Sequence, residues 1–130
     1  MGTRDRRIAA IAALLLALGT VLGALGAHAL ETRLAPDRLE IYETAVRYHF
    51  FHALGLLAIG LTGNAGGGGA TRAAVVLLLV GIALFCGSLY LLAFGAPRML
   101  GMVAPFGGAS LIVGWVLFAI GIWRARTSHG

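Results

Sequence analysis

Four long apolar segments, separated by short polar or glycine-rich stretches, dominate the pattern of the chain. A helix rises about 1.5 Å per residue, so about 20 apolar residues cross the hydrocarbon layer of a membrane. The pattern therefore predicts an all-α protein with one polytopic membrane domain over 1–130, in which four transmembrane helices form an antiparallel bundle. The expected spans are about 8–29, 44–62, 73–95 and 101–123.

The most polar stretch of the chain, 31–47, precedes the second apolar segment. Pro36 should break the first helix, because its ring and its missing N–H do not fit a helix interior. Asp37 with Glu40 has the form of a helix start, in which acidic side chains bind free backbone N–H groups. The second helix should therefore begin near Arg38, with a short amphipathic stretch in or above the headgroup region before its span.

Glycine and proline mark the remaining breaks. The link 63–70 contains four consecutive glycines, cannot hold a helix cheaply and should be a flexible connection. Pro97 should stop the third helix. Pro105 either kinks the fourth helix or stands in its first turn, where a missing N–H costs little. In the second case the stretch 99–104 should be an apolar loop at the membrane surface.

Small residues recur at regular intervals within three of the apolar segments. A spacing of four in the first segment, and of seven in the third and fourth, keeps them on one side of each helix, where another helix can approach closely. They predict helix-packing faces, and the last two segments should form a close-packed antiparallel hairpin. The glycines concerned are Gly19, Gly23, Gly81, Gly107, Gly114 and Gly121.

The composition agrees with a chain that lies in lipid. Hydrophobic residues make up 59% of it and charged residues 12%, against about 45–50% and about 25% in soluble domains. The net charge of +5 comes from ten arginines at the ends of the apolar segments, as in topology signals, and not along one face as in nucleic-acid binding. The expected partners are therefore membrane lipids, and the chain itself or another membrane protein, but no nucleic acid.

The arginines also predict an orientation. Six lie at the two termini and the glycine link, and four lie on the other side of the predicted membrane domain. The side richer in positive charge is normally cytoplasmic, so Met1 and Gly130 should both face the cytoplasm from a bacterial inner membrane. A cleaved secretory signal is an alternative for the first segment, because Ala27-His28-Ala29 imitates a cleavage site, but the apolar run is longer than a usual signal core.

A few polar side chains stand inside the apolar segments, where ionisable groups are costly and need a reason. Counted by helix rise, they fall at one level in the outer half of the membrane. They form the candidate intramembrane polar cluster: His28, His49, His52, Ser88 and Tyr90. We expect no catalytic residue, cofactor or metal, because no nucleophile and base stand at motif-like spacing and no third strong metal ligand accompanies the histidines.

Three interpretations of this cluster are open. In the first, neutral histidines hydrogen-bond to Ser88, Tyr90 or carbonyls of a neighbouring helix, and the protein is a small structural or accessory component of the membrane without enzymatic activity. In the second, His28 with His49 or His52 binds a ligand, a metal or haem. In the third, the histidines serve small-solute transport or proton relay.

Four stretches carry a further signal: LGALGAHAL from residue 22, YHFFHALGLL from residue 48, CGSLYLLAFG from residue 86 and APFGGASLIVGW from residue 104. Together they resemble the YgdD-like family of small integral membrane proteins, domain-of-unknown-function family 423. The resemblance implies a four-span inner-membrane protein without an established activity or cofactor. It also implies that one histidine of the second segment, His49, often has another polar residue in its place, whereas the characteristic positions are His28, His52, Ser88, Tyr90 and Pro105. The resemblance thus centres the binding and transport interpretations on His28 and His52.

Overall fold

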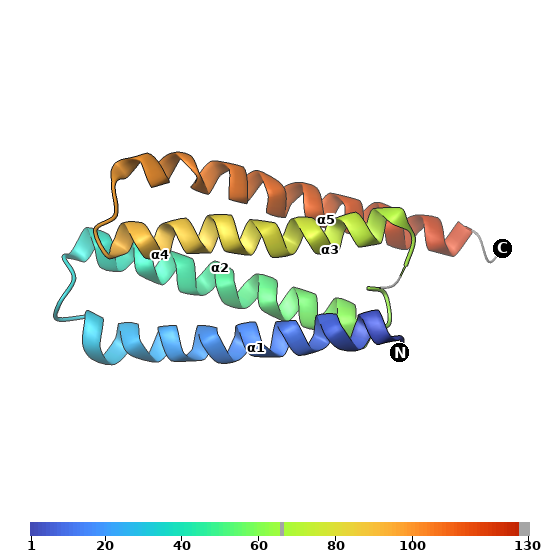
Figure 1. Cartoon of the computed structure of the whole chain (residues 1–130), viewed down its shortest axis with the longest axis horizontal. Coiled ribbons are helices and arrows are strands. Elements are labelled where there is room, and N and C mark those ends of the chain that lie inside the picture. The colour runs from blue at the N-terminus through green and yellow to red at the C-terminus, as the bar shows by residue number, and fades with distance from the viewer. Residues whose placement is uncertain (66, 128–130) are drawn as a thin grey trace.

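The computed structural model describes residues 1–65 and 67–127, and all the regular structure within them is helical, so the predicted all-α class is confirmed. Four long rods lie side by side in alternating directions (Figure 1). The expectations for Gly66 in the glycine link and for Gly130 fall outside the described residues. The elements are α1 (Thr3–Leu25), the π-helical η1 (Gly26–Leu30), α2 (Pro36–Leu61), α3 (Gly69–Gly81), the π-helical η2 (Ile82–Cys86), α4 (Gly87–Ala93), the 3-10 helix η3 (Arg98–Met102) and α5 (Ala104–Thr127).

Within the described residues, three stretches of helix are long and apolar enough to cross a membrane: Thr3–Leu30, Gly69–Ala93 and Arg98–Arg126. Helix α2 is long enough but not apolar enough to count among them, because its first turns are charged and its middle contains two histidines. Its outward side chains are nonetheless apolar, since Phe51 and Leu61 are each 59% exposed. By length and composition the structure therefore has three candidate spans and one more polar helix beside them.

The second helix begins earlier than the sequence suggested. Pro36 is its first residue, not a breaker of the helix before it, and the helix does not wait for Arg38. The first position suits proline because an N–H there would have no helical partner anyway. The residue before it, Ala35, provides no side-chain cap, so the expected acidic helix start from Asp37 and Glu40 is not how this helix begins. The amphipathic stretch is the first turns of one continuous helix.

The other helix ends also differ in detail from the prediction. The helix α3 begins at Gly69, inside the link that was expected to be non-helical. The elements α3, η2 and α4 follow one another without a break and form the third rod. This rod ends at Ala93, before Pro97, because Gly95 adopts a φ of +96°, a left-handed conformation that favours glycine and ends the helix. Pro105 stands in the first turn of α5, the second of the two alternatives for it, and the stretch expected as a loop before it is mostly the short η3.

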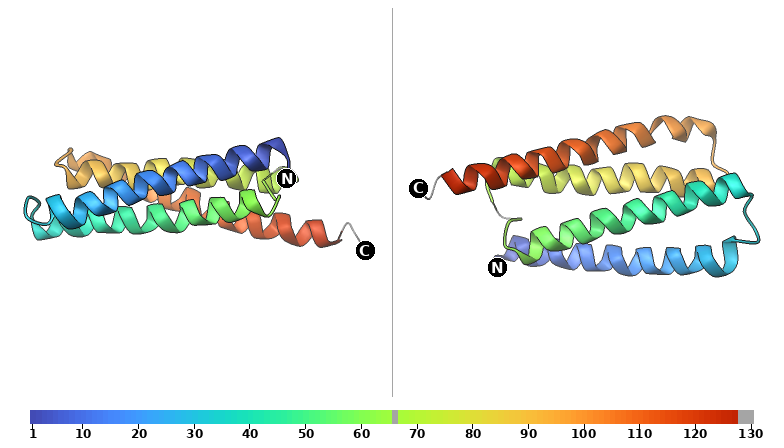
Figure 2. Two further views of the ribbon diagram at one scale, coloured as in Figure 1. Left: turned by 90° about the horizontal axis from the view of Figure 1, so that it is seen from below. Right: turned by 180° about the vertical axis from the view of Figure 1, so that it is seen from behind.

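The four rods form two antiparallel hairpins that the third rod joins. Helix α1 packs along α2, and α3 packs along α5. Within the third rod, η2 touches both α5 and α2, and α4 packs on α2. Figures 1 and 2 show α5 diverging from α4 at one end of the bundle and α2 diverging from α3 at the other. The π-helical turn, which holds an extra residue, thus lies where the rod changes its neighbour.

Glycines allow the backbones within each hairpin to approach closely. A Cβ atom on Gly107 would lie 2.8 Å from the Cα of Phe85, and one on Gly60 would lie 2.7 Å from the backbone N of Ala9. Neither neighbour can rotate away, since both are backbone atoms. The remaining glycines predicted on the last two segments lie in the same interface of α5 with the third rod: Gly81, Gly114 and Gly121.

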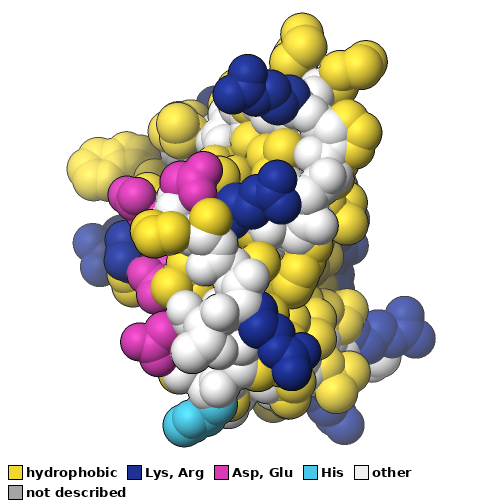
Figure 3. Space-filling view, turned by 90° about the vertical axis from the view of Figure 1, so that its left-hand side faces the viewer, with side chains coloured by type: hydrophobic (Ala, Val, Ile, Leu, Met, Phe, Trp, Pro, Cys, Tyr) yellow, Lys and Arg dark blue, Asp and Glu magenta, His cyan; other side chains and the backbone are white. Residues whose placement is uncertain are grey.

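Charged side chains gather at the two ends of the bundle. Figure 3 looks onto the end where α1 finishes and α5 begins, and shows arginine and acidic side chains intermixed. The segments at this end contain four acids and four arginines: Glu31, Asp37, Glu40, Glu43, Arg33, Arg38, Arg47 and Arg98. The end with both termini has six arginines and Asp5, so the net charge of +5 belongs to that end.

Candidate functional site

The centre of the bundle contains a hydrogen-bonded histidine. His49, in the middle of α2, is only 2% exposed. Its Nε2 lies 2.7 Å from the carbonyl oxygen of Leu15, and its Nδ1 lies 2.9 Å from the hydroxyl of Tyr90. A carbonyl can only accept a hydrogen bond, so Nε2–H donates to Leu15, and in the neutral tautomer this leaves Nδ1 to accept from the Tyr90 hydroxyl. The imidazole thus ties α2 to both α1 and α4.

This network leaves no free polar atom on His49. Both ring nitrogens are occupied, and among the described residues no buried side-chain nitrogen or oxygen lacks a hydrogen-bond partner. A buried polar group without a partner would cost several kcal/mol in a hydrocarbon environment, on the order of the whole stability of many small proteins. The arrangement fits a structural histidine. A ligand or a metal at His49 would have to break one of these bonds first.

Gly19 explains how the imidazole reaches the backbone of α1. In an α-helix the carbonyl of one residue points toward the N–H of the residue four positions later, so the Leu15 carbonyl lies beside Gly19. A Cβ atom on Gly19 would lie 3.3 Å from the Cδ2 of His49, a tight contact that would press on the ring. Without a side chain there, the carbonyl is open to the neighbouring helix.

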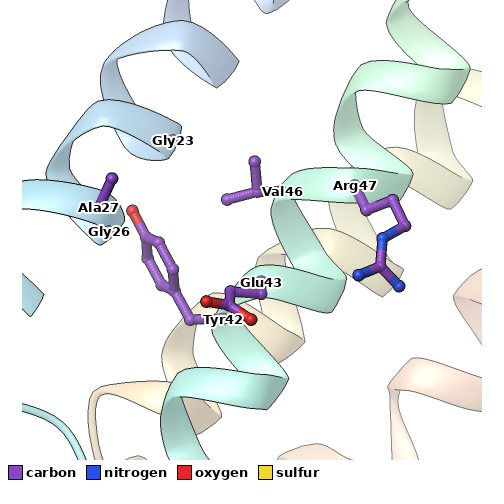
Figure 4. Close-up of a pocket in the computed structure, with 7 residues that line it drawn as sticks. All are labelled: Gly23, Gly26, Ala27, Tyr42, Glu43, Val46 and Arg47. Carbon is purple, nitrogen blue, oxygen red and sulfur yellow. The ribbon is translucent and has the colours of Figure 1, made fainter. Parts of the chain in front are cut away.

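The same arrangement occurs two turns nearer the end of α1. Tyr42 is 1% exposed, and its hydroxyl donates to the carbonyl of Leu22, four residues before Gly26. A Cβ atom on Gly26 would lie 2.7 Å from the Cε1 of Tyr42. Figure 4 shows the Tyr42 ring directed from α2 toward α1, with Val46 on the same side, opposite Gly23.

A third example joins α5 to α3. The Ser110 hydroxyl donates to the carbonyl of Leu77 at 2.7 Å, and the residue four positions after Leu77 is Gly81. All three side-chain hydrogen bonds that cross between rods to a backbone carbonyl thus end on a residue four positions before a glycine, within the described part of the chain. Small residues at helix interfaces therefore do two things here: they admit a close neighbour and they uncover an acceptor.

The remaining residues of the predicted cluster do not join this network. Ser88 donates to the carbonyl of Phe85 in its own rod at 2.9 Å. His28 lies in η1 and is exposed. Equal depth in the membrane, the basis of the prediction, says nothing about which side of a helix a residue occupies. Of the predicted cluster, the structure brings together His49 and Tyr90, and it adds Tyr42, whose ring meets that of Tyr90 at a centroid distance of 5.5 Å.

His52 has a different environment from His49. It is 8% exposed, and its Nδ1 lies 2.7 Å from the carbonyl oxygen of Tyr48, one turn earlier on α2. By the same argument Nδ1–H donates to that carbonyl, and in the neutral imidazole this leaves Nε2 as a lone-pair acceptor. The imidazole stacks on the Tyr48 ring, with centroids 5.9 Å apart and 13° between the planes, and faces Trp115 at 6.1 Å.

A groove between α2 and α5 lies in front of this imidazole. Its volume is about 280 Å³, and its floor is η2. The Nε2 atom has no hydrogen-bond partner among the described residues, yet it is not sealed in the interior, so it opens to the groove. Apart from the imidazole, the Tyr48 hydroxyl and the Trp115 indole N–H, the described lining is apolar: Tyr48, His52, Phe85, Gly108, Leu111, Ile112 and Trp115.

The chemistry available to these sites is that of hydrogen bonding. Among the described residues, no three histidine, cysteine or acidic side chains come close enough together to hold a metal ion. His49 is fully engaged with the protein, whereas His52 offers one acceptor to whatever occupies the groove. The sequence pointed to His52 as a polar residue in an apolar segment, but it did not indicate that Trp115 of α5 forms the opposite side of the groove. Gly55 was a signal for this contact, because a Cβ atom there would lie 2.6 Å from the Cζ2 of Trp115.

The apolar rods, the glycine-lined contacts and the buried hydrogen bonds between helices define an all-helical membrane protein. The family can be stated as well. The chain belongs to the family described as protein of unknown function (DUF423), whose model matches residues 22–108, as the resemblance of its four sequence stretches predicted. The matched region includes the whole of α2 and the third rod.

Individual relatives agree with this assignment. The chain is 42% identical over 114 residues to a UPF0382 membrane protein of Staphylococcus saprophyticus, covering 85% of this chain and 89% of the relative. It is 40% identical to the membrane protein YwdK of Bacillus subtilis, covering 82% and 85% of the two chains. It is 32% identical to the inner membrane protein YgdD of Escherichia coli, covering 81% and 80%. No solved structure matches the chain.

Proposed function

We propose that α2 is a fourth membrane span. It lies beside the three candidate spans and runs antiparallel to the first of them. Its interior side packs deep in the bundle, since Leu56 is fully buried and His49 reaches the middle of α1. Its opposite side carries large exposed apolar residues, such as Phe51 and Leu54, that suit lipid. Its polar first turns lie at the end of the bundle where α1 finishes and α5 begins, among arginine and acidic side chains (Figure 3).

Four spans place both termini on one side of the membrane, and we propose that this side is cytoplasmic. The end with the termini carries six arginines, and the other end carries four arginines among an equal number of acids. Positive residues close to spans are retained on the cytoplasmic side. The name of the relative YgdD as an inner membrane protein supports the bacterial inner membrane as the location.

We further propose that the protein is a structural or accessory component of that membrane and not an enzyme. The observation that carries this proposal is the state of His49, which has both ring nitrogens bonded within the protein and so holds three rods together. Membrane lipids, another copy of the chain or another membrane protein are its proposed partners. The runner-up is a binding or transport role. The exposed position of His28 leaves His52 alone as its centre.

Topology is tested with reporters that act on only one side of the membrane. Alkaline phosphatase and green fluorescent protein are each fused after Thr127 and, separately, in the connection after Ala35. Fluorescence at the first site and phosphatase activity at the second are expected. The opposite result at both sites would reverse the orientation, and the same result at both sites would remove α2 as a span.

The accessory role is tested with the purified full-length protein. In liposomes it should produce no solute or proton flux above that of protein-free vesicles. When it is extracted from its native membrane in mild detergent, it should migrate as a discrete complex. This complex should be either a homo-oligomer or an assembly of fixed stoichiometry with another membrane protein. Saturable flux in liposomes, abolished by His52→Phe, would contradict the accessory role and favour transport.

A further inference from the structure

The groove in front of His52 combines three properties that together identify an occupant. It holds one unpaired hydrogen-bond acceptor on a side chain that is more than nine-tenths buried. It has aromatic walls, and none of the described residues that line it is charged. Resting on the proposed four-span topology, we propose that it binds the ring of a neutral, lipid-soluble hydroquinone, whose hydroxyl donates to His52 Nε2.

The depth of His52 argues for a neutral occupant. The residue lies nine positions before Leu61, the end of α2, and helix rise places it about 14 Å from that end, near the middle of a hydrocarbon layer of about 30 Å. The phosphate and ammonium groups of phospholipids stay at the surface, because charges are costly at this depth. A hydroquinone is uncharged and dissolves in the same layer as the groove.

The hydrogen bond of His52 to its own helix argues for the reduced form of the ring. Its Nδ1–H is used by the Tyr48 carbonyl, so the Nε2 atom of the neutral imidazole can only accept a hydrogen bond. A hydroquinone has hydroxyl donors, whereas the corresponding quinone has only carbonyl acceptors. To donate to a quinone, the neutral imidazole would have to move its proton to Nε2 and leave the Tyr48 carbonyl without that partner.

The walls and the size of the groove argue for a single ring. Tyr48, Phe85 and Trp115 present aromatic surfaces around the imidazole, and aromatic groups favour offset or edge-to-face contacts with another ring. The volume of about 280 Å³ is just below the range of about 300–1,000 Å³ typical of sites for drug-sized ligands. A second apolar pocket between the same two helices lies on the other side of Trp115 and is lined by Ala58, Phe118 and Ile122 among others.

The test measures binding and not turnover. Full-length protein in lipid nanodiscs is titrated with a decyl-tailed hydroquinone kept reduced under nitrogen, with its quinone, and with decanol, which has a hydroxyl but no ring. The readout is the midpoint of thermal unfolding, which rises saturably with a ligand that binds the folded state. We expect a saturable rise with the hydroquinone and at least about tenfold weaker binding of the other two, the loss that one hydrogen bond or one ring contact can account for.

Three variants make the test specific. His52→Phe keeps the ring but removes the acceptor, and should weaken hydroquinone binding about tenfold. Gly108→Leu fills the groove from α5, where a Cβ atom has only ordinary contacts with Phe85 at 3.7 Å, and should abolish binding even if His52→Phe proves unstable. The matched control His28→Phe changes an exposed histidine outside the groove and should bind as the parent does.

The proposal is overturned if no form of the ring raises the unfolding midpoint, or if hydroquinone, quinone and decanol bind alike. It is also overturned if both groove variants bind as the parent does, or if a second copy of the chain closes the groove, seen as cross-linking between cysteines placed at Ile112 of two copies. The reporter fusions decide the topology independently. A wrong topology is therefore detected by the reporter fusions, whereas a groove that binds no ring is detected by the unfolding titration.

Discussion

Two neighbouring glycines at the start of α5 offer a matched test of how the bundle is packed. Gly107 is buried against η2, whereas Gly108 is partly open. A Cβ atom at Gly107 would lie 2.8 Å from the Cα of Phe85 and 2.9 Å from the backbone carbon of Leu84. At Gly108 the nearest atom would be in the Phe85 ring at 3.7 Å, an ordinary contact.

The magnitude follows from these distances. Carbon atoms pack at about 3.5–4.0 Å, so an alanine at Gly107 must move α5 away from the third rod by about 1 Å, and a gap of that size loses up to about half of each dispersion contact along it. Overpacking of this kind costs about 1–3 kcal/mol, and backbone neighbours place Gly107 at the upper end. Alanine also gains about 1 kcal/mol of helix propensity at either position. Gly107→Ala should therefore lose about 2 kcal/mol and Gly108→Ala should gain about 1 kcal/mol.

The difference between the two variants isolates the packing cost, because both replace glycine by alanine in the same turn of one helix. The free energy of unfolding is measured in mixed micelles by titration with sodium dodecyl sulfate, with circular dichroism as the readout. Gly87→Ala serves as a further control, since a Cβ atom at that position would have no neighbour from another element within 4 Å in the described part of the chain. Equal effects of the alanines at Gly107 and Gly108 would show that α5 does not contact the third rod as described.

Three further predictions concern the hydrogen bonds between the rods. His49→Leu should lower the free energy of unfolding by about 2 kcal/mol, since each bond between membrane helices contributes about 0.6 and up to about 2 kcal/mol; a double-mutant cycle with Tyr90→Phe should show coupling, and strict additivity would contradict the bond. Ser110→Ala should lower the free energy of unfolding by about 0.6–1.7 kcal/mol, measured in the same titration, and no change would contradict a stabilising bond from its hydroxyl to the carbonyl of Leu77. Gly26→Ala should cost about 1–3 kcal/mol in the parent but almost nothing in a Tyr42→Ala background, and an equal cost in both would remove Tyr42 as the neighbour.

The number and order of the helices could be predicted from the sequence. Apolar runs of the length of a span, with glycine and proline between them, need no tertiary information to be recognised. The predicted ends of the helices were less accurate, because the residue at which a helix begins or ends depends on local capping. The left-handed Gly95 ends the third rod before Pro97 can, and Pro36 begins a helix that it was expected to delimit.

The faces of the helices could not be predicted in the same way. In a soluble helix the polar side marks the outside, but a helix in lipid is apolar all round, so its periodicity does not separate interior from exterior. His28 and His49 therefore looked alike in the sequence, although one is exposed and the other is 2% exposed. A usable signal was present in the glycines. Gly26 and Gly81, like Gly19, each lie four residues after a carbonyl that receives a side chain from another rod.

The change of neighbour at η2 has a consequence for how the bundle is connected. Helix α5 packs chiefly on α3 and η2, whereas α4 reaches back to α2. The bonds from Tyr90 through His49 to Leu15 involve only the first three rods, so they do not depend on the position of α5. The contact of α5 with this three-rod unit adds a separate bond, from the Ser110 hydroxyl to the carbonyl of Leu77.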